Sequence, residues 1–243
     1  LSGGHVSGTL RFVVCMDIAQ TLVVITDDHQ LCCIDIAPDA VRFAPATGLA
    51  RPALFDVTLR HAPADCIQLT AETVDALHRV ARLALAARAL GAAQKGFELV
   101  LDHAKVRRQF GQPIGQFQAI QHKLANSRMQ LDGAQLQIDA AAAAAVQNRA
   151  AWPLAAHAAI TYCAQSLRQI ALETQHCFGA IGFAEEHDAP KLFRRIHADV
   201  ARMGGAAGAR AEFAHLLFDG EGDAYAAADA GGSDPASGLR SEL

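Results

Sequence analysis

Aromatic side chains are scarce in this chain. They make up 6% of its 243 residues, with one Trp and two Tyr, whereas hydrophobic residues as a whole reach 51%. A sandwich of strands draws on aromatic and β-branched residues for its core, and an alanine-rich sequence is better suited to close-packed helices. The composition therefore argues against an all-β protein and favours a helical core. The length suffices for one large domain or two small ones.

The chain also lacks an excess of basic charge. It holds 21 Lys and Arg against 25 Asp and Glu, a net charge of −4, and it contains no long basic run. Neither nucleic acid nor an anionic membrane surface is therefore indicated as a partner. No apolar run reaches the roughly 18 residues that a membrane span requires. The alanine-rich segment 134–146 is interrupted by Gln135, Gln137 and Asp139.

Metal-binding and disulfide patterns are missing as well. The six cysteines show no C-x-x-C spacing and the eleven histidines form no H-E-x-x-H pattern, which argues against a zinc site. Disulfides are not expected, and the cysteines are predicted to be reduced thiols in a cytoplasmic protein. The first residues do not resemble a signal peptide. Because the chain starts with Leu1 and not Met, we expect a fragment, a split gene or a misplaced start.

The first quarter of the sequence is predicted to form β structure. Short β-branched runs between Val6 and Ile25 alternate with turn residues, and the Asp-Asp-His sequence at 27–29 marks a hairpin turn. Further strands are expected over 31–36 and 55–59, with proline-containing loops between them. The pattern predicts a partial β domain over residues 1–69.

From Thr70 onward the hydrophobic pattern is helical. Thr70 is the expected N-cap of a long helix, with Glu72 in its first turn. The predicted helices cover 71–106, a long segment after 113–115, Pro153 to about 177, 190–202 and 206–218. Because the connecting loops are short, neighbouring helices are expected to run antiparallel.

These elements predict an α+β fold, in which a partial β-barrel or sheet domain is followed by an antiparallel four-helix bundle over residues 70–219. Residues 220–243 are rich in Gly, Asp, Ser and Ala and contain almost no large apolar side chain. Such a segment cannot bury enough apolar surface to order itself, so we predict a disordered tail there.

The most informative stretch is R-R-Q-F-G-Q-P-I at residues 107–114, followed by F-Q at 117–118 and L-A at 124–125. A plain helix–helix turn with basic residues that complement the helix dipole would require fewer special residues. The run resembles the R-x-x-F-G-x-P-I…F-Q…L-A signature of acyl-CoA dehydrogenases, flavoenzymes that desaturate acyl-CoA thioesters. The resemblance implies that this loop contacts the FAD of a neighbouring subunit. A guanidinium such as that of Arg107 suits the pyrophosphate, which it can grip with two parallel hydrogen bonds.

A second block supports the same resemblance. It consists of G-A-I-G-F at 179–183, E-H-D-A at 186–189 and L-F-R-R at 192–195, and it is similar to a family segment whose small residues let the backbone approach the FAD. The resemblance covers about residues 6–218. It implies six cofactor-side residues: Arg107, Gln109, Phe110, Gln118, Gly179 and Ala180. In this block the family's glutamine and histidine fall at His176 and Phe178, which is a departure from the pattern.

Two further departures concern the flavin and substrate side. The sequence does not contain the family's N-terminal helical domain or its T-E-P-x-x-G-S-D loop. The family's W-[IV]-[TS] strand falls at Phe12-Val13-Val14. Phe12 can replace the aromatic ring beside the flavin, but Val14 lacks the hydroxyl that would hydrogen-bond flavin N5.

The last departure concerns the catalytic base. Removal of the substrate's α-proton requires a carboxylate, and the family's two alternative glutamate positions fall at Met203 and Ala81. Neither side chain can accept a proton. The remaining candidates are Asp199, Glu185 and Glu186. For each of these, a solvated or ion-paired carboxylate without a catalytic role is the competing interpretation.

Two functions of different classes stay open. The first is FAD-dependent α,β-desaturation of an acyl-CoA thioester, either with a base not yet located or as a truncated, base-lacking subunit. Some bacterial relatives that act on bulky, steroid-like acyl-CoAs pair a chain carrying the base with one that lacks it. The second is a non-catalytic helical scaffold or pseudoenzyme that binds no flavin. We expect a homo- or hetero-oligomer in either case, and in the first case one with shared FAD sites. The acyl substrate is not predicted.

Overall fold

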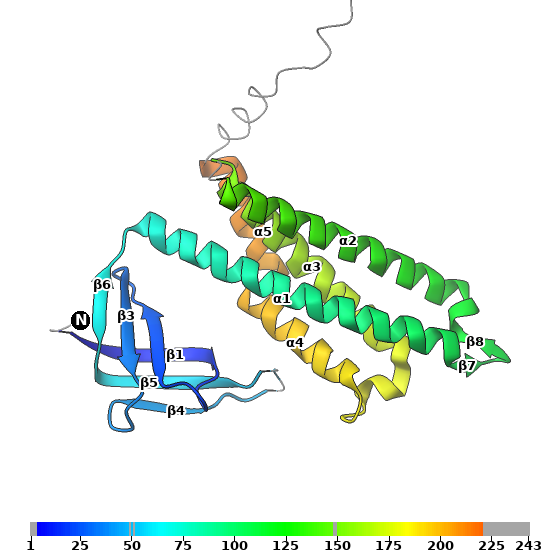
Figure 1. Ribbon diagram of the computed structural model, residues 1–243, viewed down its shortest axis with the longest axis horizontal. Helices are drawn as coiled ribbons and strands as arrows, with labels where there is room; N and C mark the ends of the chain where they lie inside the picture. Colours follow the sequence, from blue (N-terminus) through cyan, green and yellow to red (C-terminus); the bar gives the residue numbers. More distant parts are fainter. Residues whose placement is uncertain (1–3, 49, 51, 148–149, 221–243) are drawn as a thin grey trace, which may run out of the picture.

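A computed structural model describes residues 4–48, 50, 52–147 and 150–220. Its strands form one part and its helices another, and the long helix α1 (Ala71–Val106) leads from the first part into the second (Figure 1). The predicted α+β fold is confirmed. The predicted disordered tail falls almost entirely on residues 221–243, which lie outside the described residues.

The six strands that precede α1 form two antiparallel three-stranded sheets. One has the order β1-β5-β4, and the other has the order β2-β3-β6. Their bounds are β1 His5–Val14, β2 Thr21–Ile25, β3 Gln30–Asp35, β4 Val41–Pro45, β5 Leu54–Pro63 and β6 Asp65–Gln68. Apolar side chains from both sheets, among them the fully buried Ile34 and Val57, share one core. The described strands close no barrel, so of the two expected forms the structure has the open sheet.

The predicted hairpin turn joins β2 to β3. His29 has a φ of 61°, which a non-glycine residue adopts mainly in tight turns. The Thr26 hydroxyl accepts a hydrogen bond of 3.0 Å from the Gln30 amide and so closes the turn.

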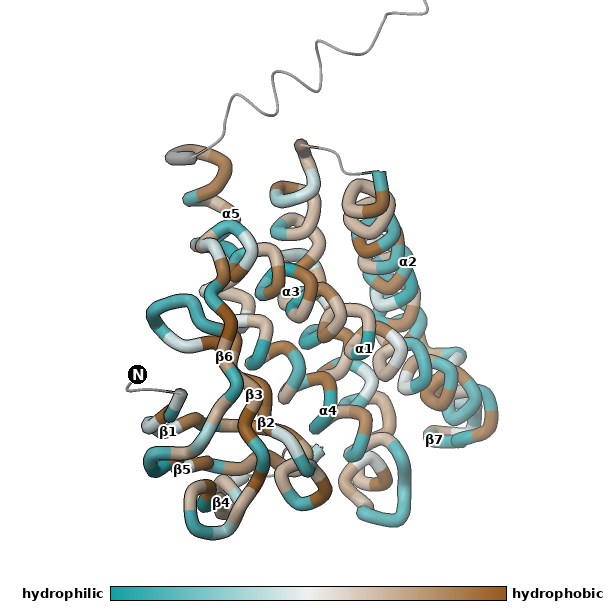
Figure 2. The backbone as a smooth tube through the Cα atoms, turned by 60° about the vertical axis from the view of Figure 1, so that its left-hand side comes forward, coloured by the Kyte–Doolittle hydropathy of each residue, from teal (hydrophilic) through white to brown (hydrophobic). Residues whose placement is uncertain are grey.

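In Figure 2, long brown stretches mark β2 and β3, whereas hydrophilic and hydrophobic segments alternate along α2.

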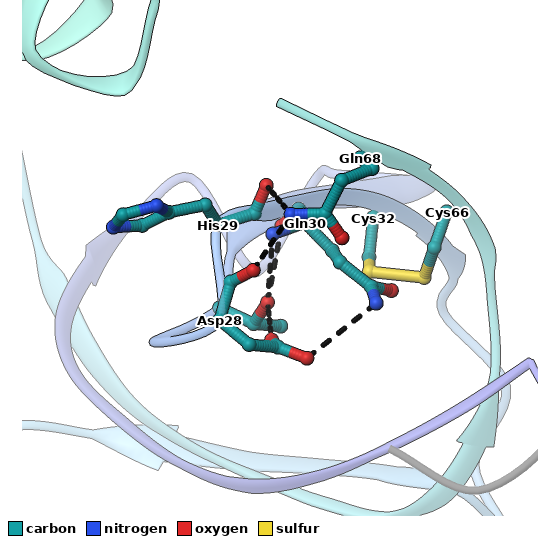
Figure 3. Close-up of a disulfide and its surroundings, with 7 residues drawn as sticks. Asp28, His29, Gln30, Cys32, Cys66 and Gln68 are labelled. Atoms are coloured by element: carbon teal, nitrogen blue, oxygen red, sulfur yellow. Dashed lines mark hydrogen bonds between the residues drawn. A yellow bond between two sulfur atoms is a disulfide. The ribbon is translucent and has the colours of Figure 1, made fainter. Parts of the chain in front are cut away.

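A disulfide joins Cys32 of β3 to Cys66 of β6 (Figure 3). The two residues are direct partners in the register of these antiparallel strands, with Cα atoms 4.1 Å apart. The expectation that the cysteines are all reduced thiols is therefore wrong. Gln68 also donates a 2.8 Å hydrogen bond to the Asp28 carbonyl. Because β6 leads within two residues to Thr70, these links fix the place where α1 begins.

The helices follow the predicted pattern closely. Their bounds are α1 Ala71–Val106, α2 Gln118–Val146, α3 Trp152–Phe178, α4 Asp188–Arg202 and α5 Gly205–His215, the last continued by a π-helical turn over Leu216–Gly220. Thr70 caps α1 as predicted, its hydroxyl accepting a 3.2 Å hydrogen bond from the Thr73 amide. Helix α4 begins two residues before the predicted start, because the His187 ring accepts a 3.0 Å hydrogen bond from the Ala189 amide.

Helix α3 lies at the centre of the bundle. Its side chains Ile160, Leu167 and Ile170 are fully buried, and they pack in one cluster with residues of α1, α2 and α4. Burial of each such side chain contributes about 1.5–3 kcal/mol relative to its exposure. Within the described ranges, no helix is long and apolar enough to cross a lipid bilayer.

Candidate functional site

A large cleft separates the strands from α4. It has a volume of about 1170 Å³, and Figure 1 places α4 on the side of the bundle that faces the sheets. Its walls consist mainly of apolar side chains from β1 and β2, with one face of α4 opposite. The residues that line it are Leu10, Arg11, Phe12, Val13, Val14, Leu22, Val23, Val24, Ile25, Ala50, Leu54, Phe193, Arg194, His197, Ala198, Ala201 and Arg202.

Phe12 lies in an irregular part of β1. The register between β1 and β5 shifts between Leu10 and Val13, and Phe12 has a φ of 60°. A left-handed conformation is unfavourable for a bulky residue and indicates a bulge, which changes the direction of a side chain. Phe12 is half-exposed and lines the cleft beside Val14. The structure therefore brings the predicted Phe12-Val13-Val14 strand to the wall of a cavity.

Basic groups from α4 border this apolar cleft. Glu185 accepts two hydrogen bonds from Arg194, of 2.6 and 2.9 Å, and so holds its guanidinium. The His197 ring stacks on Phe193 with ring centroids 4.1 Å apart. Burial, and secondarily the charge of Arg88, lowers the pKa of Arg202. An arginine nevertheless stays cationic in proteins, so the α4 side of the cleft is basic.

The first motif block forms an exposed loop at the far end of α1. Residues Arg108–Gln109 (β7) and Gln112–Pro113 (β8) pair as a short ribbon, and Phe110 and Gly111 turn it with φ values of 52° and 83°. Phe110 is 93% exposed, and its ring meets Phe117 edge-on. The Gln109 amide only reaches the neighbouring Arg108 carbonyl, at 2.9 Å.

Two further predicted residues belong to the same loop. Gln118 is exposed at the first position of α2. Arg107 is exposed directly after α1, and its backbone amide donates a 2.8 Å hydrogen bond to the His103 carbonyl. Its guanidinium has no hydrogen-bond or ion-pair partner among the described residues. The loop therefore presents an unpaired cation and a largely exposed aromatic ring to its surroundings.

The second motif block lies at the same end of the bundle. Helix α3 ends at Gly179, whose φ of 62° and ψ of −139° favour glycine. A Cβ placed there would meet no atom within 4 Å, so the backbone is open to approach. Ala180 follows in an exposed turn. The buried side chain of Gln175 donates to the Gly182 carbonyl and holds the turn against α3.

Ring contacts join the end of α1 to the end of α3, the two helices that lead into the motif blocks. The Phe178 ring lies between His103 of α1 and His187, with ring centroids 5.2 and 4.9 Å apart. Burial, followed by the charges of Arg107 and His187, lowers the pKa of His103. The structure thus brings together the ends of helices that are about 70 residues apart in the sequence.

The resemblance places the family's two glutamate positions at Ala81 and Met203, which have different surroundings. Arg82, the residue after Ala81, donates a 2.9 Å hydrogen bond from its Nε to the carbonyl of Met203. Met203 is fully buried in the bundle core, and Ala81 is exposed. Met203 is not among the described residues that line the cleft. No carboxylate stands at either position.

The remaining acidic candidates have different surroundings. Asp199 is fully buried, and both of its carboxylate oxygens accept hydrogen bonds from Arg88 of α1, the one from Nε at 3.0 Å. Glu186 is exposed in the turn before α4. Sequence reasoning did not single out Arg88 or Arg82. Arg88 is an arginine within an otherwise apolar stretch of α1, which is the signal that could have pointed to it, whereas Arg82 lies beside His78 and Arg79 and no pattern singles it out.

Comparisons with known proteins agree with the motif blocks. A family model described as "Acyl-CoA dehydrogenase, C-terminal domain" matches residues 74–209. The chain is 33% identical over 187 residues to acyl-CoA dehydrogenase FadE34 of Mycobacterium tuberculosis, an alignment that covers 76% of this chain and 26% of that protein. It is 32% identical over 126 residues to acyl-CoA dehydrogenase IpdE2 of Mycolicibacterium smegmatis, covering 51% of this chain and 38% of that protein.

Solved structures show the same fold. A Tcur3481-Tcur3483 steroid ACAD variant superposes with a TM-score of 0.78 at 25% identity, covering 93% of this chain and 60% of that one. The ChsE4-ChsE5 complex of Mycobacterium tuberculosis gives a TM-score of 0.79 at 20% identity, covering 88% of this chain and 60% of that one. The chain spans a quarter to two fifths of these curated relatives and about three fifths of these structures.

Proposed function

Because the chain belongs to the acyl-CoA dehydrogenase family, we propose that it forms part of an FAD-dependent enzyme that desaturates acyl-CoA thioesters. One observation carries the proposal. The two motif blocks lie together at one end of the bundle, where Arg107 has no partner among the described residues and Phe110 is 93% exposed. An unpaired guanidinium and a largely exposed aromatic ring are suited to contact a ligand or a neighbouring chain.

The described residues fit the flavin chemically. Arg107 can bind a pyrophosphate through its fork of donors, and Phe110 can pack against a planar ring. At Gly179 the backbone is accessible because no side chain and no neighbouring atom covers it. FAD, when bound, accepts the hydride that leaves the β-carbon of the acyl group. The role of this chain would be to hold and orient the cofactor at the interface between subunits.

We further propose that this chain supplies no catalytic base at the two positions where the family has a glutamate. Met203 and Ala81 cannot accept a proton, and Asp199 is already neutralised by Arg88. A partner chain would then contribute the carboxylate. The names of the two structural relatives support this division, because each names two different proteins.

The size and lining of the cleft suit a bulky apolar acyl group. Its volume of about 1170 Å³ slightly exceeds the roughly 300–1,000 Å³ of ordinary ligand pockets, and apolar side chains form most of its walls. A steroid is named for one of the structural relatives. We therefore propose a bulky, steroid-like acyl-CoA as the substrate class, with the basic side of α4 turned toward the polar part of the thioester.

Flavin stoichiometry tests this function. The chain would be purified alone and after co-expression with any acyl-CoA dehydrogenase-like chain encoded beside it, and bound flavin would be measured by visible absorbance. We expect flavin in the co-expressed complex and a loss of at least tenfold in flavin affinity for Arg107→Ala, because a charge-assisted bidentate contact is removed. Lys105→Ala is the matched control, since Lys105 is exposed and, among the described residues, pairs only with Asp102.

A non-catalytic scaffold or pseudoenzyme is the second candidate. The observation that favours it is the chemistry of Val14 and Met203, neither of which can form the contact or transfer the proton that the family reaction needs. In that case neither the single chain nor the complex would hold flavin, although circular dichroism would show a folded helical protein. Equal flavin affinity in Arg107→Ala and the unmodified complex would contradict the role assigned to Arg107.

A further inference from the structure

A separate cavity of about 660 Å³ lies on the bundle between α2, α3 and α5. It shares no residue with the cleft or with the motif segments 107–118 and 179–183. The side chains that reach it are polar: Gln130, Tyr162, Gln165, Ser166, Arg168, Gln169 and Arg210, with Ala206 completing the wall. No carboxylate is among these described residues, although the whole chain has 25 acidic residues against 21 basic ones.

The two arginines of this cavity differ in their contacts. The Gln165 side-chain oxygen accepts a 2.9 Å hydrogen bond from Arg210 and so holds that guanidinium in place. Arg168 has no hydrogen bond or ion pair to any described residue. The nearby Glu173 accepts from Gln169 but is already paired with Lys123. The two positive charges are therefore not balanced by an acidic side chain within the cavity.

A close contact between helices places a hydroxyl at the same cavity. If Gly133 of α2 carried a Cβ, that atom would lie 2.4 Å from the hydroxyl oxygen of Tyr162. Only glycine therefore lets the Tyr162 ring lie across α2. The Tyr162 hydroxyl has no hydrogen-bond partner among the described residues, so its proton is available to a ligand. Ala206, in the first turn of α5, adds the positive end of a helix dipole to the wall.

We propose that this cavity binds a phosphate-bearing small molecule. Two guanidinium groups and a phenolic hydroxyl supply only donors to an anion, and a phosphate offers three acceptor oxygens to them. The volume exceeds what one phosphate group fills. The side-chain amide of Gln130 can both donate and accept, and Gln165 and Gln169 each keep one polar group beyond their bonds to Arg210 and Glu173, which suits the uncharged polar part of an organic phosphate.

Titration calorimetry on the full chain tests the site, with inorganic pyrophosphate and ADP as the two probes. We expect both probes to bind and Arg168→Gln and Arg210→Gln each to weaken binding about tenfold, the effect of one charge-assisted contact. Tyr162→Phe keeps the ring and removes only the hydroxyl, and it is expected to weaken binding about fivefold. Tighter binding of ADP than of pyrophosphate would identify an organic phosphate, and equal binding would identify free phosphate.

Two controls separate this site from general charge attraction and from the flavin loop. Arg128→Gln removes the same charge from α2, where Arg128 pairs with Asp132, and it should change the affinity by less than twofold. Because the flavin loop can itself contact a pyrophosphate, both probes are also titrated into Arg107→Gln, in which the losses caused by the cavity variants should be the same as in the unmodified chain. The proposal is overturned if the unmodified chain binds neither probe, or if Arg128→Gln weakens binding as much as Arg168→Gln. It is equally overturned if Arg107→Gln abolishes binding while the cavity variants retain it.

Discussion

The ion pair between Arg88 and Asp199 ties α1 to α4 in the bundle. Asp199 is fully buried, whereas the Arg88 side chain is 38% exposed. Replacing Arg88 by Met keeps most of the aliphatic volume and leaves a carboxylate in the core without a partner. Removal of one partner from a fully buried pair costs about 3–5 kcal/mol. Because solvent reaches Arg88, we expect a smaller loss, roughly 2–4 kcal/mol of unfolding free energy.

Urea denaturation followed by far-ultraviolet circular dichroism measures this loss directly. For a chain of this size, the expected change corresponds to a decrease of about 5–15 °C in Tm. The double variant Arg88→Met, Asp199→Leu removes both charges and should recover most of the stability, since replacing a buried pair by apolar side chains is often neutral.

Arg128→Met is the matched control for the loss of an arginine. It breaks the exposed pair of Arg128 with Asp132, whose side chains are 63% and 53% exposed, and should cost less than about 1 kcal/mol. If Arg88→Met were no more destabilising than Arg128→Met, or if the double variant were as unstable as the single one, the reasoning about a buried carboxylate would be refuted.

Three further predictions concern protonation, thiols and packing. Burial, and next the charge of Arg82, lowers the pKa of His157. Because the unfolded chain then binds the proton more readily, the unfolding free energy should fall as the pH drops below about 6.5. Urea titrations at pH 7.5 and 5.5 should show a smaller fall for His157→Gln than for the unmodified chain. A thiol reagent should label two cysteines rapidly in the native chain, the exposed Cys15 and Cys33, and four after denaturation without reductant; six labelled thiols in the unreduced, denatured chain would contradict the disulfide. Gly133→Ala would bring the new Cβ to 2.4 Å from the Tyr162 hydroxyl oxygen, at a cost of about 1–3 kcal/mol. This cost is offset in part by the ~1 kcal/mol that alanine gains over glycine in a helix, so the denaturant midpoint should fall, and an unchanged or higher midpoint would contradict the close packing.

The sequence predicted the helices well where local signals mark their ends. Thr70 precedes a long helical pattern, and α1 begins and ends within that pattern at Ala71 and Val106. The two motif blocks were also recognisable, because each is a continuous run of special residues. The motif blocks did not reveal that Phe178 packs against His103, the contact that places both blocks at one end of the bundle.

Contacts between distant residues were not predictable. Cys32 and Cys66 are 34 positions apart and meet only because β3 pairs with β6 in one particular register. Arg88 and Asp199 are 111 positions apart and lie on different helices. No spacing in the sequence indicates such pairs, since they depend on how strands and helices pack. The absence of C-x-x-C patterns was therefore a poor guide to the oxidation state of these cysteines.

The surroundings of Met203, and not only its inability to accept a proton, bear on where the catalytic base of the proposed reaction comes from. Its side chain is fully buried in the bundle core and lies outside the lining of the cleft, while its carbonyl is held by Arg82. A carboxylate introduced into this apolar core would lose its hydration, which is costly for a buried charge. Asp199, one helical turn earlier, already has its charge compensated by Arg88. The packing at this end of α4 thus favours a structural role for the segment, and a base supplied from outside the chain agrees better with it than one supplied from within.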